Sequence, residues 1–185
     1  MKKFYKKGFT LIELLVVVAI IAILALIVLL ALNPVEMARR SRDSRRLSDL
    51  GTIRRAIDLA LADKQSLVNA DFDISTSTLV TAFDGVDGGT LNISKYLSVV
   101  PQDPVNDGSV GTVQVISYDG TDCVPTTGID KGTMVYHYWS DGNNYVLSAR
   151  LESMENCIAI LQDGNTDGNY QIGTDPGLDE VTDAP

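Results

Sequence analysis

A single acidic side chain, Glu13, lies inside an otherwise uncharged apolar run from Phe9 to Leu32. A carboxylate in hydrocarbon costs about 2.5 to 3.5 kcal/mol on insertion scales, so an ionisable residue there is a candidate functional group. Its chemistry would be that of a charge partner, because an ammonium group in the same apolar setting attracts it strongly. The alternative is that Glu13 reaches the membrane interface and is stabilised by the positive end of its own helix.

Cys123 and Cys157 are the two cysteines of the chain. Their separation fits neither a CxxC redox pair nor a zinc-binding pattern. Outside the cytoplasm a disulfide bond is the simplest interpretation, and closing a loop of this size contributes about 3 to 4 kcal/mol in the chain-entropy model. Two buried thiols that pack as small apolar groups are the alternative.

The C-terminal segment DGNTDG places oxygen-bearing side chains at alternate positions, followed by Gly168. This spacing is typical of the first half of a calcium-binding loop, in which the oxygens converge and glycine permits the turn. Thr174 stands where such a loop has its closing glutamate, so a later acid would have to replace it. The alternative is that these Asp-Gly and Asn-Gly pairs only form turns. The candidate calcium ligands are Asp163, Asn165, Asp167, Asn169 and Asp175.

Enzymatic chemistry is poorly represented. His137, the only histidine, lies in an aromatic stretch, where a position on a sheet surface is more common than catalysis. The sequence contains no glycine-rich phosphate loop, zinc pattern or serine-nucleophile elbow. Carboxylates are so numerous that residue types alone do not exclude a glycosidase-like pair. We predict no catalytic residue.

These residues belong to three zones of different charge. The apolar run would extend about 36 Å as a helix, enough to cross a bilayer core of roughly 30 Å. Residues 36–55 carry seven arginines against three acids, whereas residues 56–185 carry 20 acids against four basic side chains. The acidic zone excludes nucleic-acid binding through phosphate contacts, which need the opposite charge. Four lysines precede the run and five arginines closely follow it, so charge alone does not favour an external head.

Gly8 followed by FTLIELLVVVAIIAIL resembles the leader and methylation motif of type IV prepilins and type II secretion pseudopilins. In that family a membrane peptidase cuts after the glycine and methylates the new amino terminus. The resemblance therefore implies cleavage between Gly8 and Phe9 and N-methylation of Phe9. It also implies filament assembly in which Glu13 of one subunit neutralises the Phe9 amine of its neighbour. The implied partners are prepilin peptidase, an inner-membrane assembly platform, membrane lipid and further copies of the chain.

The same resemblance decides the expected location, because the leader motif requires a cytoplasmic start. The cysteines and the Asp-rich loops also suit an oxidising, ion-rich exterior. We expect a single pass through the cytoplasmic (inner) membrane with the head outside the cytoplasm. After assembly we expect a cell-surface or periplasmic filament.

A second apolar stripe follows the membrane run at helical spacing. We predict one long helix from Phe9 to Ala62 that kinks or opens at Asn33-Pro34, because proline removes a backbone donor. Residues 36–46 are polar on every face, so we expect them to have no core of their own. They form either a solvated helix or, in a bundle of shifted copies, a helix whose arginines meet acids of neighbouring subunits. The stripe consists of Leu47, Leu50, Ile53, Ile57 and Leu61.

The remaining sequence predicts a small antiparallel sheet. The segments TVQVISY, TMVYHYWS and NYVLSARLES alternate in period two, and the last two flank DGNN, which is typical of a hairpin. One face should carry Tyr136, Tyr138, Leu147 and Ala149, and the other His137, Trp139 and Arg150. A short helix is expected over 91–97. The fold class is α+β and pilin-like, with the long N-terminal transmembrane helix packed on this sheet.

VPQDPVNDG, YHYWSDGNNYVLSARLES and the Asp- and Gly-rich tail also resemble the head of the major pseudopilin of type II secretion. Those pseudopilins bind calcium in their C-terminal loop, so the resemblance implies calcium as a ligand here. The predicted organisation is a cleaved leader (1–8), a transmembrane and assembly helix (9–32), a helical stem (33–64) and an acidic head with a C-terminal loop (65–185).

The leading hypothesis is a structural subunit of a type IV pilus-like filament or of a type II secretion pseudopilus. The alternative is a membrane-anchored extracellular enzyme, or a calcium-dependent binding module, that uses a pilin-type anchor. The effect of replacing Glu13 discriminates between them, because only a filament subunit needs that acid for assembly.

Overall fold

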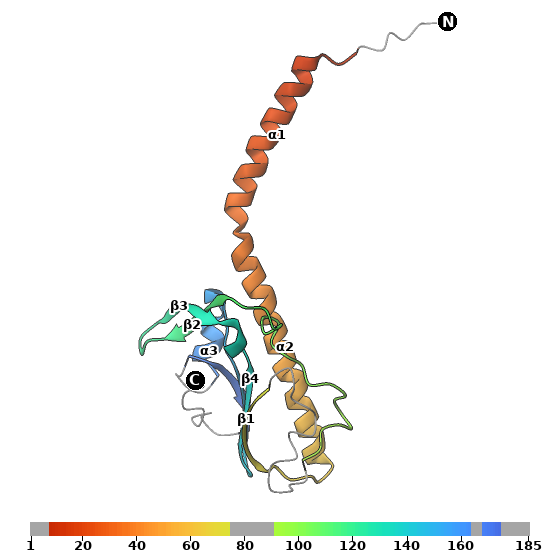
Figure 1. Cartoon of the computed structure of the whole chain (residues 1–185), viewed down its shortest axis with the longest axis vertical. Helices are drawn as coiled ribbons and strands as arrows, with labels where there is room; N and C mark the ends of the chain where they lie inside the picture. Colours follow the sequence, from red (N-terminus) through yellow and green to blue (C-terminus); the bar gives the residue numbers. More distant parts are fainter. Residues whose placement is uncertain (1–7, 75–90, 164–167, 175–185) are drawn as a thin grey trace, which may run out of the picture. The chain divides into compact units, whose positions relative to one another are not determined.

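The computed structural model describes residues 8–74, 91–163 and 168–174. The chain divides into two compact units, residues 1–38 and 39–185. The first unit contains the apolar helix, and the second contains the acidic head (Figure 1).

The long helix that the sequence predicted opens at Asn33-Pro34, as expected, and forms two helices. Helix α1 covers Leu11–Leu32, and helix α2 covers Pro34–Ala62. Asn33 separates them with a φ of 40°, in the left-handed region that asparagine tolerates better than most residues. Pro34 takes the first position of α2, where a missing N–H breaks no helical hydrogen bond.

The head contains a four-stranded antiparallel sheet in the order β1-β4-β5-β6. Its strands are β1 (Asn69–Ile74), β4 (Tyr136–Asp141), β5 (Tyr145–Ala149) and β6 (Tyr170–Gly173). A separate antiparallel pair consists of β2 (Thr112–Tyr118) and β3 (Cys123–Asp130). Three short helical segments complete the head: η2 (Lys131–Thr133), η3 (Met154–Asn156) and α3 (Cys157–Leu161).

The core of the head lies between α2 and one face of the four-stranded sheet (Figure 1). Leu50, Ile53 and Ile57 of α2 are fully buried there against side chains of β4 and β5. The prediction for the sheet faces is correct, because Tyr136, Tyr138, Leu147 and Ala149 all belong to this core, whereas His137 and Trp139 are only partly buried.

The predicted hairpin is confirmed between β4 and β5, where Tyr138 pairs with Leu147. The Asp141 carboxylate accepts hydrogen bonds from the backbone N–H groups of Asn143 and Asn144, at 2.7 and 2.6 Å. Gly142 has a φ of 87°, which glycine adopts without a side-chain clash. The turn residues therefore fix the register that faces the tyrosines toward α2.

Several expectations are wrong. Residues 91–97 form turns rather than a helix, with the N–H groups of Tyr96 and Leu97 both donating to the Ile93 carbonyl. Of the predicted stripe, Leu61 is partly buried and packs against the core, whereas Leu47 is only partly buried; Ala56 and Ala60 complete the buried face of α2. Strands β1, β3 and β6 were not predicted, since their segments show no clear period-two pattern of β-branched and aromatic residues.

The expectation that residues 36–46 have no core of their own is also wrong. Asp43 and Arg46 are both fully buried. The sequence left open a solvated helix and pairing with acids of neighbouring subunits, and neither includes burial of these two side chains within the same head. Their partners lie far along the chain, as described below.

Candidate processing and assembly site

The bond between Gly8 and Phe9 lies in an exposed, non-helical segment that precedes α1. Phe9 is 78% exposed, and no other atom lies within 4 Å of the position that a Cβ on Gly8 would take. A protease needs an extended, accessible backbone, and this segment offers one on the N-terminal side of the apolar helix.

Thr10 caps the start of α1. Its hydroxyl accepts a hydrogen bond from the Glu13 backbone N–H at 3.3 Å, the arrangement expected for an N-cap threonine three residues before a glutamate. Glu13 therefore lies in the first helical turn, near the positive end of the helix dipole. The T-x-x-E spacing that signals this cap was in the sequence but was not used in the prediction.

The Glu13 side chain is exposed, and within the described part of the chain its carboxylate forms no ion pair or hydrogen bond. The helix dipole stabilises this charge by about 0.3–1 kcal/mol, less than the cost of placing it in hydrocarbon. A counter-charge from outside the single chain would supply the rest.

Helix α1 is apolar on every side. A window at Leu11–Leu29 has a mean hydropathy of 3.3, and none of it is buried. Such a helix is long and apolar enough to cross a membrane, although a signal sequence passes the same test. A helix that is apolar all round requires lipid or other helices as its surroundings.

A family model for the prokaryotic N-terminal methylation motif matches residues 3–29. This motif supports a type IV prepilin-like protein. The matched residues include Gly8, Phe9 and Glu13, the residues that the sequence predicted for processing and assembly. No curated protein and no solved structure matches the chain.

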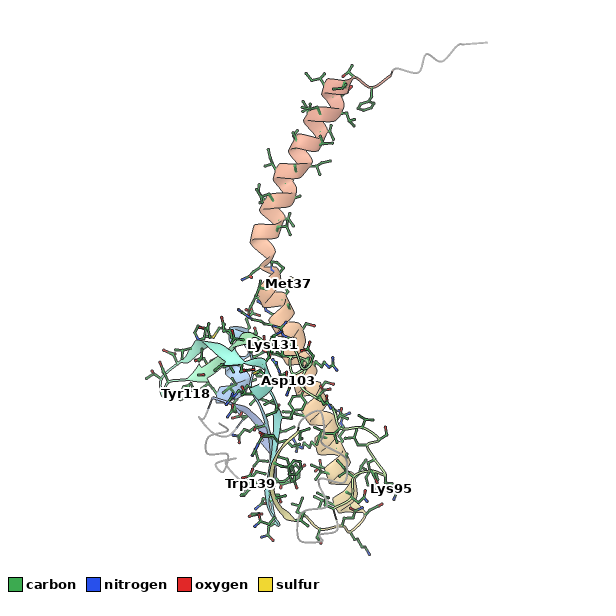
Figure 2. The ribbon with its side chains drawn as sticks, in the orientation of Figure 1. Met37, Lys95, Asp103, Tyr118, Lys131 and Trp139 are labelled. Atoms are coloured by element: carbon green, nitrogen blue, oxygen red, sulfur yellow. A yellow bond between two sulfur atoms is a disulfide. The ribbon has the colours of Figure 1, made fainter. Side chains whose placement is uncertain are left out.

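A buried ionic cluster ties the stem of the prepilin-like chain to its head. Arg46 donates from Nε and Nη2 to the Asp103 carboxylate, at 2.6 and 3.0 Å. Asp103 is labelled in Figure 2. The Nη1 atom of Arg46 lies 2.8 Å from both Asp43 Oδ1 and Glu152 Oε1. Arg42, one turn earlier, donates to the same Glu152 carboxylate from Nε at 2.8 Å and from Nη2. Sequence reasoning missed this cluster, because its three segments are far apart along the chain.

Asp43 is the second centre of the ionic cluster. Its carboxylate accepts from the backbone N–H groups of Glu152 and Ser153, at 2.8 to 3.1 Å, and from Asn156 Nδ2 at 2.8 Å. Ser153 is the N-cap of η3, so the stem carboxylate satisfies backbone donors at the start of that helical turn. The segment that begins at Glu152 therefore depends on a side chain of α2.

The electrostatics of the ionic cluster favour the charged forms. Burial opposes the charge on Arg46, but Asp103, Glu152 and Asp43 outweigh it and raise its pKa above the ordinary value. Burial likewise opposes ionisation of Glu152, but the hydrogen bonds and charges of Arg42 and Arg46 hold its pKa below the usual range. Each buried charge is thus compensated by an opposite charge, as buried ions require.

Arg40, Arg42, Arg45 and Arg46, which closely follow the span, have acidic partners in the head unit. Arg42 and Arg46 belong to the ionic cluster, Arg40 pairs with Glu155, and Arg45 lies 3.7 Å from Asp49. In the folded head the positive charges of these four residues are therefore compensated by carboxylates.

Two tyrosines of the sheet also anchor α2. Tyr136 donates to Asp49 at 2.9 Å and Tyr145 donates to Asp58 at 2.7 Å. Burial, followed by the adjacent carboxylate, raises the pKa of both hydroxyls. Burial raises the pKa of the Tyr138 hydroxyl to about 12. These hydroxyls therefore remain protonated donors at neutral pH.

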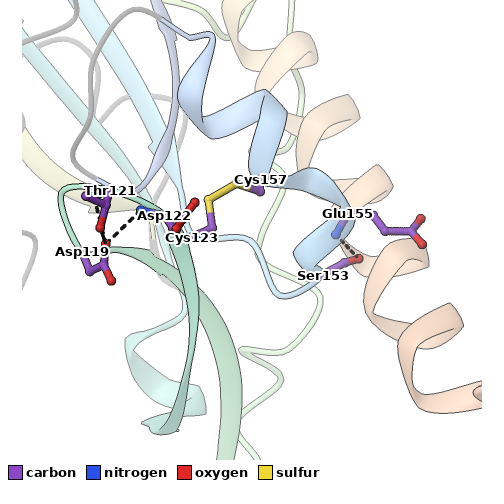
Figure 3. The surroundings of a disulfide bond; sticks show 7 residues. All are labelled: Asp119, Thr121, Asp122, Cys123, Ser153, Glu155 and Cys157. Carbon is purple, nitrogen blue, oxygen red and sulfur yellow. Dashed lines mark hydrogen bonds between the residues drawn. A yellow bond between two sulfur atoms is a disulfide. The ribbon is translucent and has the colours of Figure 1, made fainter.

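A disulfide bond joins Cys123 at the start of β3 to Cys157 at the start of α3, with a Cα–Cα distance of 6.0 Å (Figure 3). The structure thus forms the pairing that the sequence favoured. Asp119, close to Cys123, accepts hydrogen bonds from the N–H groups of Thr121 and Asp122 at 2.9 Å, which lower its pKa to about 2 (Figure 3). The bond links the β2–β3 pair to the segment that Asp43 holds.

The predicted calcium ligands are only partly described. Asn165, Asp167 and Asp175 lie outside the described residues. Asp163 accepts a hydrogen bond from the Gln171 N–H at 2.7 Å. Among the residues that the structure describes, no group of three acidic, histidine or cysteine side chains could hold a metal ion. Asp163 and Asn169 alone are too few for Ca²⁺, which takes six to eight oxygen ligands.

His137 lies on the sheet face that points away from α2, between two acids of the neighbouring strand β1. Its Nδ1 is 2.9 Å from Asp73 Oδ1, and its Nε2 is 3.0 Å from Asp71 Oδ1. Both ring nitrogens therefore face carboxylates. No ring nitrogen is directed at a serine or cysteine nucleophile, so this arrangement does not resemble a catalytic triad.

Proposed function

We propose that this protein is a structural subunit of a type IV pilus-like filament or of a type II secretion pseudopilus. In this proposal the chain is stored in the cytoplasmic (inner) membrane through α1, with its head outside the cytoplasm. Prepilin peptidase cuts after Gly8 and methylates Phe9. An inner-membrane assembly platform then adds the subunit to a cell-surface or periplasmic filament.

The Glu13 carboxylate on an otherwise apolar helix supports this proposal best, because it forms no ion pair or hydrogen bond with residues 8–74, 91–163 and 168–174. The apolar side chains of α1 are 46–82% exposed over the described part of the helix, so a single copy does not cover them. Lipid covers such a surface but offers no counter-charge in its hydrocarbon core. The α1 helix of a neighbouring copy offers apolar cover and also a positive charge. That charge is the ammonium group that cleavage creates at Phe9, with an ordinary pKa of about 7.7 to 8.0.

The pairing would be intermolecular. Phe9 and Glu13 lie at the start of the same helix, where Thr10 caps the helix by accepting a hydrogen bond from the Glu13 N–H. The geometry for an ion pair between Phe9 and Glu13 of one chain is therefore poor. Two copies that are shifted along the helix axis bring the amine of one chain level with the carboxylate of the other. The pair then fixes the axial register of subunits, which is the best-attested use of a buried charge.

Replacing Glu13 with leucine tests the proposal. Assembled filament should fall to below about a tenth of the wild-type amount, because a loss above 1.4 kcal/mol corresponds to more than tenfold. The variant should still enter the membrane, since α1 becomes more apolar. Filament is measured by shearing cells and quantifying the released subunit. Glu13→Asp, which keeps the charge, is the matched control and should retain more filament.

Unchanged filament in Glu13→Leu would contradict this role of Glu13. A different result would favour the alternative of an anchored enzyme or binding module. In that result neither the wild type nor Glu13→Leu forms filament, and the variant keeps a binding or enzymatic activity of the wild type.

We also propose that the loop over 163–175 binds calcium. Asp163 and Asn169 are the members of the predicted ligand set that the structure describes, and Gly168, with a φ of 86°, takes the left-handed conformation that glycine permits in such loops. Millimolar Ca²⁺ should raise the unfolding temperature of the chain relative to EGTA, because a ligand that binds only the folded state stabilises it. Asp167→Asn should reduce this shift, and equal unfolding temperatures in Ca²⁺ and EGTA would exclude the site.

A further inference from the structure

Thr10, the N-cap of α1, follows Phe9 and so lies next to the bond between Gly8 and Phe9. Its backbone is extended, with φ −85° and ψ 150°, and the two residues before it are non-helical. Its hydroxyl accepts a hydrogen bond from the Glu13 N–H at 3.3 Å, and its carbonyl accepts one from the Leu14 N–H at 3.3 Å. Thr10 therefore sets the boundary of α1 through both its side chain and its backbone.

An earlier start of α1 would draw the Gly8 carbonyl into the helix. In an α-helix each N–H donates to the carbonyl four residues before it. A helix that began two residues sooner would direct the Ile12 N–H at the Gly8 carbonyl. Glycine is an acceptable N-cap, so Gly8 competes with Thr10 for this role. A carbonyl that accepts such a bond is less open to attack by a peptidase.

Packing contributes little to the extended shape of this segment. Phe9 is 78% exposed, and apart from its chain neighbours no atom of the described residues lies within 4 Å of the position of a Cβ on Gly8. The first N–H groups of a helix lack partners within it, and such groups are costly in hydrocarbon. An earlier start would move these groups away from the apolar run. The Thr10 hydroxyl offsets that advantage, because it gives the Glu13 N–H a partner.

We infer that Thr10 is a positioning residue for cleavage after Gly8. Its hydroxyl fixes the start of α1 beyond Phe9 and leaves the Gly8 carbonyl accessible. In this hydrolysis the bond between the Gly8 carbonyl carbon and the Phe9 nitrogen breaks. Water supplies the oxygen of the new carboxylate and a proton for the new amine. The inference rests on the proposed function, because it requires that prepilin peptidase processes the chain.

Cleavage of the full chain by prepilin peptidase in membranes tests the inference, with kcat/KM compared among variants. Thr10→Val keeps the shape of the side chain but removes the acceptor. Its kcat/KM should fall about two- to tenfold, because the loss of an N-cap shifts the equilibrium between helix starts by a similar factor. Thr10→Ser, which restores the hydroxyl, should keep at least about half of the wild-type value.

Thr10→Asn separates capping from recognition of the hydroxyl by the peptidase, because asparagine caps a helix without a hydroxyl. This variant should also be cut at close to the wild-type rate. The Phe9 ¹³Cα chemical shift of the labelled, uncleaved chain in detergent gives a second readout. It should move toward the helical value in Thr10→Val and stay at the wild-type value in Thr10→Asn.

Thr52→Val is the matched control, because it removes a hydroxyl that bonds to the Ser48 carbonyl within α2, far from the cleavage site. It should leave kcat/KM unchanged. The inference is overturned if Thr10→Val is cut as fast as the wild type, if Thr10→Asn is cut as slowly as Thr10→Val, or if Phe9 keeps the same shift in all variants. A wild-type chain that is not cut at all would contradict the proposed function, and the inference with it.

Discussion

Asp43 and Arg46 occupy positions on α2 that continue the spacing of its apolar core residues. The buried residues of this stripe recur at alternating intervals of three and four: Asp43, Arg46, Leu50, Ile53, Ile57 and Ala60. The same helix face is thus ionic near the span and apolar farther along. A shift of α2 by one turn would place Arg46 against apolar side chains, so the charged pair favours a single register of the helix in the head.

Arg46→Met should lower the free energy of unfolding of the head by about 3 to 5 kcal/mol. The substitution keeps a long apolar stem but leaves Asp103 buried without its arginine partner and removes one of the two arginines that face Glu152. Denaturant unfolding, followed by tyrosine and tryptophan fluorescence, measures the difference.

The matched control for this prediction is Arg55→Met on the exposed side of α2. It should change the free energy of unfolding by no more than about 0.5 kcal/mol. Equal effects of the two substitutions would show that the ionic cluster adds nothing to stability.

Acidic pH should lower the free energy of unfolding of the head, because Glu152 becomes protonated. Its folded-state pKa lies below the ordinary value of 4.5, because Arg42 and Arg46 outweigh the effect of burial. The stabilisation is therefore fully present above pH 4.5 and is lost as the pH falls through the folded-state pKa. Unfolding free energies measured between pH 6 and pH 3 should decline toward acid. Glu152→Gln should show a shallower decline, and an identical slope in both proteins would refute the assignment.

At the scale of the elements, the segment 151–161 connects three parts of the head. Asp43 of α2 holds its first residues, the disulfide bond joins it to β3, and the Leu151 carbonyl accepts from the Ile116 N–H of β2 at 2.7 Å. The β2–β3 pair therefore depends on two links to this segment, one covalent and one hydrogen-bonded.

Reduction of the disulfide bond should lower the free energy of unfolding by about 3 to 4 kcal/mol, because the unfolded chain regains the freedom of the closed loop. The unfolding midpoint in dithiothreitol, compared with that in buffer, measures the loss. A Cys123→Ala/Cys157→Ala variant should unfold at the reduced midpoint and should not respond to dithiothreitol. If dithiothreitol left the wild-type midpoint unchanged, the disulfide would have no role in stability.

The hairpin and the core helix could be predicted from sequence because their signals are local. DGNN fixes the turn, and Leu50, Ile53 and Ile57 have helical spacing. Strand β6 could not be predicted, because it pairs with a strand far upstream and is short. Gly173 shows why local sequence does not predict this strand pairing. A Cβ at this position would lie 2.0 Å from the Tyr145 carbonyl oxygen. Only the pairing with β5 explains why a glycine is needed, and no local pattern reveals that pairing.

At the scale of the whole molecule, the sequence combines an apolar helix, a basic neck and an acidic head. The neck residues Arg40, Arg42 and Arg46 pair with acids of the head. The methylation motif that contains Gly8, Phe9 and Glu13 was predictable because it is one contiguous stretch of sequence. The ionic cluster was not predictable, because Asp103 and Glu152 join α2 only in the folded head.

The identity of the mature N-terminus tests the central claim most directly. Mass spectrometry of the protein isolated from membranes or filaments should find a chain that begins at Phe9 with a methylated amine. A catalytically inactive prepilin peptidase should leave the leader in place, which provides the control. A chain that still begins at Met1 in the presence of an active peptidase would contradict processing, and with it the creation of the charge that Glu13 is proposed to meet.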